Sequence, residues 1–211
     1  MARKLCDQTV SAVAHFQIER GRHIACRRGC SACCRYLVPV NEVEALDLMA
    51  HVESLPAPRR LLLLEAFDTA AATMLRAGPP PVDPDPQALS AWYLGLGLPC
   101  PMLADGECVL YDRRPLACRE HMVTTPASAC RGARPAGEPI QMPVSVAQAV
   151  ADLTAELTGK PAQTAFLPLA LHWAKTRTDL ARAVWPAQRV FGTLARILRN
   201  LAKPAMAPEC R

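Results

Sequence analysis

The sequence predicts a mainly α-helical fold, with a small, irregular cysteine-rich domain, a minor β-hairpin and a helical C-terminal extension. Apolar residues recur at helical spacing in several long segments. Proline occurs 20 times in 211 residues, about twice its usual frequency of roughly 5%. This abundance favours helices joined by rigid connections. Most of the ten cysteines lie in two short windows, which is typical of a domain organised around thiol chemistry.

Three helices are predicted in the N-terminal part of the chain. The first covers residues 3–20, where apolar residues form one helical stripe. The second covers residues 41–53, because Asn41 and Glu44 form a loose capping box ahead of an apolar run. The third covers residues 58–78; it starts with a proline, which suits a first helical turn, and stops at a glycine.

The middle of the chain is predicted to contain a rigid connector and a hairpin. Five of the eight residues in 79–86 are proline, and such a run is expected to be extended and unable to join a helix or a central strand. Residues 108–111 form one arm of a small hairpin whose turn is the Asp-Gly pair at 105–106. Any sheet in this part of the chain is therefore small.

The C-terminal part is predicted to be a series of helices. Ser145 and Gln148 form a capping box for a helix that ends at Gly159. Two or three further helical stretches follow, broken at Pro168 and Pro186.

The predicted organisation divides into a cysteine-cluster metal-binding domain, residues 1–135, and a helical extension, residues 136–211, packed on the same domain. The longest uncharged stretch, residues 87–104, contains glycines and prolines and is not expected to span a membrane. The first residues lack the apolar core of a secretory leader. We therefore expect a cytoplasmic protein without a membrane partner.

Eight cysteines are candidate metal ligands. Thiolates suit zinc or iron–sulfur clusters, which usually take four sulfur or imidazole ligands, and disulfides are disfavoured in the cytoplasm. The side chains of the adjacent residues Cys33 and Cys34 are expected to point in different directions, so ligands should come from both windows. The candidates are Cys26, Cys30, Cys33 and Cys34 in the first window, and Cys100, Cys108, Cys118 and Cys130 in and beyond the second.

The residues around these thiols have simpler interpretations. Cys6 and Cys210 lie near the termini, where fraying is common, and are interpreted as incidental. His23 and His121 are within three residues of a cysteine, but with enough thiols available they are expected to lie outside the ligand set. Six arginines are expected to compensate the charge of the thiolates: Arg27, Arg28, Arg35, Arg113, Arg114 and Arg119.

The two windows and their flanking residues also carry a recognisable pattern. It consists of Cys26-x3-Cys30-x2-Cys33-Cys34, Val38-Pro39-Val40-Asn41-Glu42, Pro99-Cys100-Pro101, Asp105-Gly106-Glu107-Cys108 and Tyr111-Asp112-Arg113-Arg114-Pro115-Leu116-Ala117-Cys118-Arg119. On these residues the chain resembles the YkgJ-type cysteine-cluster family of zinc- or iron-chelating domains, over roughly 22–130. The resemblance implies a metal- or cluster-binding domain and places the ligands on Cys26, Cys30, Cys33, Cys34, Cys100, Cys108 and Cys118.

Several functions are compatible with these residues. The cofactor is predicted to be zinc or iron, the latter also as an iron–sulfur cluster. Alternatives are an iron–sulfur enzyme, because the family resembles the flagellin lysine methylases in its cysteine motif, and a thiol redox protein using the pair Cys30 and Cys33. Basic residues at intervals of seven near the C-terminus are interpreted as a solvated face, and a nucleic-acid partner is not expected because aromatic stacking residues and a binding motif are lacking.

Overall fold

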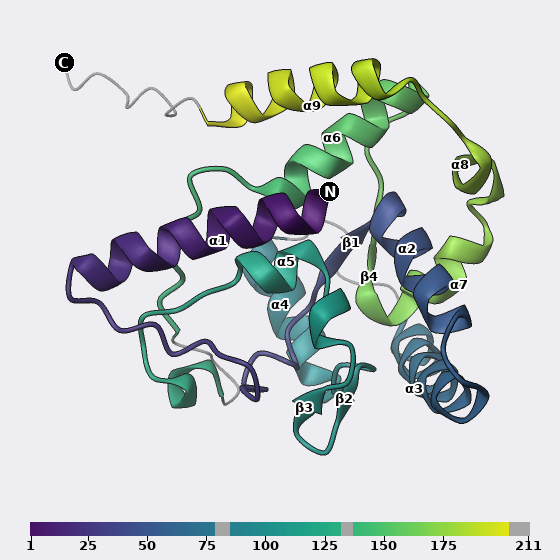
Figure 1. Cartoon of the computed structure of the whole chain (residues 1–211). Coiled ribbons are helices and arrows are strands. Elements are labelled where there is room, and N and C mark those ends of the chain that lie inside the picture. The colour runs from purple at the N-terminus through teal and green to yellow at the C-terminus, as the bar shows by residue number, and fades with distance from the viewer. Residues whose placement is uncertain (79–84, 132–136, 203–211) are drawn as a thin grey trace.

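The structure is a computed structural model that describes residues 1–78, 85–131 and 137–202, and the predicted mainly α fold is confirmed (Figure 1). The longer helices are α1 (Ala2–Glu19), α2 (Glu42–Glu53), α3 (Ala57–Arg76), α4 (Pro86–Gly95), α6 (Val146–Thr158) and α9 (Ala187–Leu201). The short helices are α5 (Leu116–Glu120), α7 (Ala170–Lys175), α8 (Thr178–Arg182) and the 3-10 turns η1 (Tyr111–Arg113), η2 (Ala127–Cys130) and η3 (Leu167–Leu169). The strands are β1 (Pro39–Asn41), β2 (Leu103–Ala104), β3 (Glu107–Cys108) and β4 (Thr164–Phe166).

The helix ends follow the predicted side-chain signals. The backbone N–H of Glu44 donates to the Asn41 side chain at 3.0 Å, which caps α2. Ser145 caps α6 in the same way, accepting from the Gln148 N–H at 3.1 Å. The helix α6 ends at Gly159, whose φ of 69° lies in the left-handed region that glycine adopts without strain. These local hydrogen bonds confirm the predicted starts of α2 and α6.

Three features of the fold differ from the sequence-based expectations. Helix α4 starts at Pro86, so the proline run does lead into a helix, because proline is compatible with the first helical position; residues 79–84 lie outside the described residues. The hairpin is present, with β2 and β3 antiparallel, but Tyr111 belongs to η1 instead of extending the strand. Strand β4 was not anticipated and pairs antiparallel with β1, placing Val40 opposite Ala165.

The core lies between α2, α3 and the segment from β4 to α7. Phe67 of α3 and Val52 of α2 are fully buried there, together with Leu167 and Leu171 from the C-terminal part of the chain. Helix α6 contacts α1, α2, α5 and β1. The C-terminal part of the chain thus supplies one strand of the β1–β4 sheet and part of the apolar core that α2 and α3 form.

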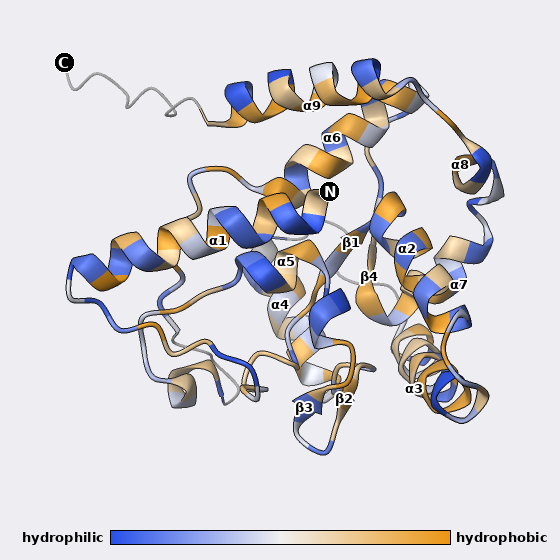
Figure 2. Cartoon of the chain, in the orientation of Figure 1, coloured by the Kyte–Doolittle hydropathy of each residue, from blue (hydrophilic) through white to orange (hydrophobic). Residues whose placement is uncertain are grey.

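The last helix, α9, packs along α6 through one apolar face. Leu194 and Ile197 are buried against Ala149 of α6, and Figure 2 shows the apolar side of α9 turned toward α6 and hydrophilic residues on the other side. Of the basic residues at intervals of seven, Arg182 ends α8, Arg189 and Arg196 lie on α9, where Arg196 pairs with Glu156, and Lys203 lies outside the described residues. In the part of the chain that is described, no helix has both the length and the apolar character needed to cross a bilayer.

Candidate metal centre

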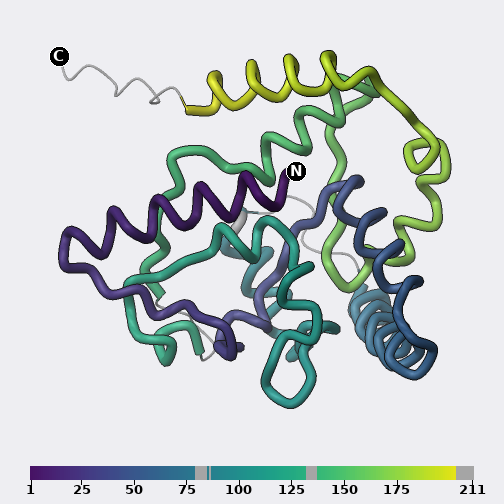
Figure 3. The backbone as a smooth tube through the Cα atoms, viewed as in Figure 1, coloured from purple at the N-terminus to yellow at the C-terminus, as the bar shows by residue number. Residues whose placement is uncertain are grey.

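Six of the eight candidate thiols line one cavity of about 60 Å³. The first window follows α1 and leads into β1, and in Figure 3 it runs beside the segment that carries the second window. The two windows are joined directly, because the backbone N–H of Cys100 donates to the carbonyl of Cys34 at 2.7 Å. The thiols that line the cavity are Cys30, Cys33, Cys34, Cys100, Cys108 and Cys118.

The expectation that the side chains of Cys33 and Cys34 point in different directions is wrong. Cys33 and Cys34 both line the cavity, and a side-chain hydrogen bond between them is the largest influence raising the pKa of Cys33. The reason is that residues 32–35 form tight turns, in which Cys34 donates its N–H to the carbonyl of Ser31 at 3.0 Å. Consecutive side chains alternate between opposite sides only in extended backbone.

The other two candidates lie beside the cavity. Cys130 is buried in an apolar cluster with Ala25, Ala32 and Val123, against which Cys26 and Cys30 also pack. The turn that carries Cys130 is held by Tyr36, whose hydroxyl donates to the Cys130 carbonyl at 2.9 Å. Cys30 therefore belongs to both groups of thiols, whereas Cys26 and Cys130 do not line the cavity itself.

The residues expected to be incidental have different surroundings. His23 is exposed, and His121 does not line the thiol cavity. The Nε2 atom of His121 is nevertheless buried without a hydrogen-bond partner, and burial lowers the pKa of this imidazole. The interpretation of Cys6 as a residue in a frayed end is wrong: its side chain is fully buried, because α1 packs on α5 and α6. Cys210 lies outside the described residues.

The cavity is a poor environment for thiolates unless a cation joins them. Burial raises the pKa of Cys100 to about 12 and also raises the pKa values of Cys108 and Cys118. These three thiols are consequently protonated at neutral pH. Bound zinc or iron would supply the missing positive charge and displace these protons.

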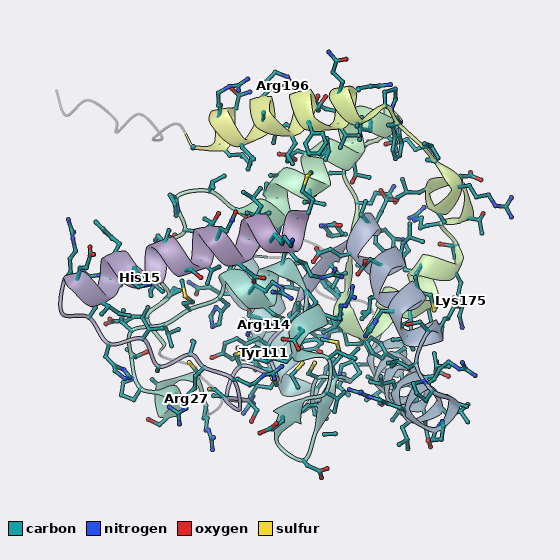
Figure 4. All side chains as sticks on the ribbon, viewed as in Figure 1. His15, Arg27, Tyr111, Arg114, Lys175 and Arg196 are labelled. Atoms are coloured by element: carbon teal, nitrogen blue, oxygen red, sulfur yellow. The ribbon has the colours of Figure 1, made fainter. Side chains whose placement is uncertain are left out.

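One arginine of the six lines the thiol cavity. The positive charge of Arg114 opposes the effect of burial on the pKa values of Cys108 and Cys118. The Arg114 Nε–H is buried without a hydrogen-bond partner, so it can donate to a thiolate sulfur. The Arg114 guanidinium also stacks on the ring of Tyr111 at 4.2 Å, and Arg28 lies over the same ring at 4.6 Å. Figure 4 shows Tyr111 and Arg114 close together near the centre of the molecule.

Arg119, in contrast, supports the second window from behind. The side chain of Arg119 is only 7% exposed. It donates to the carbonyl oxygens of Asp112 at 2.6 Å and Arg114 at 3.1 Å, and to the carboxylate of Asp7 in α1 at 2.5 Å. These bonds fasten the turn that precedes Cys118 to α1.

Two carboxylates hold the short helix α5, which carries Cys118. Glu44 accepts the N–H of Leu116 at 2.6 Å and thereby caps α5 from α2. Glu120 accepts the N–H of Val146 at 2.5 Å, which ties the end of α5 to the start of α6. The position of Cys118 is thus set by hydrogen bonds that do not involve any thiol.

The thiols converge without forming a finished coordination shell. Among the described residues, no three Cys, His, Asp or Glu side chains stand where they could hold a metal ion as they are. The donor chemistry, the burial and the adjacent Arg114 suit a thiolate-bound cation. Tyr111 was not predicted to have a role, and its only signal in the sequence is its place directly before the Asp-Arg-Arg run.

Comparison with known proteins assigns the chain to a family. The CxxCxxCC family, described as "Putative zinc- or iron-chelating domain", matches residues 25–134, slightly more than half of the chain. The protein therefore belongs to this family, and the match includes all eight candidate thiols. The family description supports binding of zinc or iron in general. No curated protein and no solved structure matches the chain.

Proposed function

We propose that this protein binds zinc or iron, the latter alone or as an iron–sulfur cluster, through thiolates from both windows. The observation that carries the proposal is the cavity shared by thiols that are up to 88 positions apart in the sequence, from Cys30 to Cys118. The ligands are drawn from the six thiols that line the cavity. Cys26 and Cys130 lie outside the cavity, in the apolar cluster against which Cys30 also packs.

The size and composition of the cavity support this proposal. About 10–15 Å³ suffices for a water molecule, so a cavity of about 60 Å³ has room for a metal ion. Six thiols exceed the four that a closed tetrahedral site requires. We further propose that residues 136–211 form one unit with residues 1–135, supported by the pairing of β4 with β1.

The experiment is metal analysis of protein purified without oxygen. Stoichiometric zinc in a colourless protein supports a mononuclear thiolate site, and iron with acid-labile sulfide and visible absorption supports a cluster. Either result supports thiolate metal binding. A protein that contains neither metal, and takes up neither when it is offered, overturns the proposal.

Single substitutions test the contribution of each window. Cys30→Ser and Cys108→Ser each remove one thiol from a different side of the cavity, and both are expected to lower the bound metal or its affinity. Cys6→Ala is the matched control, because Cys6 is buried outside the cavity. Full metal retention in either cavity variant would exclude a site that uses both windows.

A further inference from the structure

A second, larger cavity opens beside the thiol cavity. This cleft has a volume of about 650 Å³ and lies between the hairpin β2–β3, the end of α2 and the start of α3. Gly29, Cys108 and Tyr111 line both the cleft and the thiol cavity. Tyr111 therefore lies where the two spaces adjoin, and the Arg28 guanidinium of the cleft and the Arg114 guanidinium of the thiol cavity both stack on its ring.

Two arginines near His51, Arg59 and Arg113, form no ion pair among the described residues, although Asp105, Glu107 and Asp112 also line the cleft. The Arg113 side chain makes no hydrogen bond or ion pair within the described part of the chain, and the backbone N–H of Arg113 donates to the carbonyl of Leu110 at 2.8 Å. Arg59 donates one hydrogen bond, to the carbonyl of Val109 at 2.6 Å, which leaves further N–H groups available. Arg28 differs from both, because it is paired with Asp112 at 3.0 Å.

Positive charges surround His51. Burial lowers the pKa of His51, and the charges of Arg113, Arg3 and Arg59 lower it further. The hairpin adds Asp105 and Glu107 to the lining of the cleft, but neither contributes to this shift. His51 is thus an uncharged imidazole at neutral pH, able to donate one N–H toward an acceptor.

We propose that this cleft binds a small ligand through an oxyanion, a carboxylate or a phosphate group, held by Arg59 and Arg113 beside His51. Guanidinium groups suit these oxyanions because they present several N–H donors in one plane. The rest of such a ligand would lie toward Tyr111, next to the thiol cavity. The site would place the ligand one aromatic ring away from the metal centre, and its binding does not depend on which metal is present.

The test is calorimetric titration of the purified full-length protein, with the metal it carries, using inorganic phosphate and succinate in separate experiments. We expect saturable binding of at least one of them, and the stronger one identifies the oxyanion. Arg113→Gln should weaken that binding by about tenfold, as expected for loss of a charged hydrogen-bond donor. This side chain is exposed and has no partner to lose, so the variant should fold normally.

The matched control is Arg189→Gln, which removes the same charge from the exposed side of α9, outside the cleft. It should leave the affinity within about twofold of the unsubstituted protein. The proposal is overturned if neither anion binds saturably, or if Arg189→Gln weakens binding as much as Arg113→Gln does. Loss of metal in the cysteine variants, by contrast, concerns only the thiol site.

Discussion

Replacing Arg119 by methionine tests how the second cysteine window is held. The Arg119 side chain is 7% exposed, and its guanidinium donates to two backbone carbonyls and to Asp7. Loss of the two carbonyl bonds should cost about 1.5 kcal/mol each, because the donor is charged and the acceptors lose their partner. The Asp7 side chain is 55% exposed and returns to water, so its share should be below about 1 kcal/mol. The free energy of unfolding should therefore fall by about 3–4 kcal/mol.

Guanidinium chloride unfolding of the metal-loaded protein measures this loss, provided that the slope of the transition is unchanged. Asp7→Asn should cost less than about 1 kcal/mol, and Arg189→Met, on the exposed side of α9, serves as the control for losing an arginine. Arg119→Lys keeps the charge but not the fork of donors, and should fall between the wild type and the methionine variant. If Arg119→Met cost no more than Asp7→Asn, Arg119 would not be the clamp of this segment.

Three further results are expected. Tyr111→Leu removes the ring between two guanidinium groups and should speed metal removal by a chelator by roughly fivefold or more, whereas Tyr111→Phe should leave the rate nearly unchanged. Burial raises the pKa of Glu44 above its ordinary value of 4.5, so the folded state binds the Glu44 proton more tightly than the unfolded state does. Protonated Glu44 therefore favours the folded state, and this contribution to the free energy of unfolding declines as the pH rises from 4.5 through the folded pKa. In Glu44→Gln the free energy of unfolding should therefore decline less over this range than in Glu53→Gln, its exposed control in the same helix. Gly159→Ala should destabilise the protein by about 1–2 kcal/mol because of its positive φ, whereas Gly192→Ala, within a helix and with open space around it, should stabilise it by about 0.5–1 kcal/mol; thermal unfolding distinguishes the two signs.

Features of the fold that depend on neighbouring residues could be predicted from the sequence. The caps at Asn41 and Ser145 are bonds from a side chain to a backbone group three positions away, and the hairpin follows from one Asp-Gly pair. The pairing of β1 with β4 could not be predicted, because each strand has three residues and more than 120 positions separate them. The burial of Cys6 likewise depends on how α1 lies on α5 and α6.

The candidate site shows the same division between local and tertiary information. The grouping of the thiols in two windows predicted that these windows should meet, and the structure brings them to one cavity. The arginines could not be assigned in this way, because residues adjacent in sequence face different surroundings: Arg113 lines the open cleft and Arg114 lines the thiol cavity as well as stacking on Tyr111. The two arginines face different surroundings because η1 ends at Arg113 and the backbone changes direction at Arg114.

The thiol cavity is enclosed by interactions of two different kinds, and this difference bears on how metal binding and folding are coupled. Around the second window, Glu44, Glu120 and Arg119 satisfy backbone groups of α5 and its neighbours without any thiol. The first window is held by two backbone bonds, from Cys100 to Cys34 and from Ala25 to Val123, by the Tyr36 bond to the Cys130 turn and by the solvent-exposed pair of Arg28 with Asp112. A structural metal adds most stability where the protein alone supplies least. We therefore expect metal binding to order the first window. The second window is already held in place by hydrogen bonds within the protein.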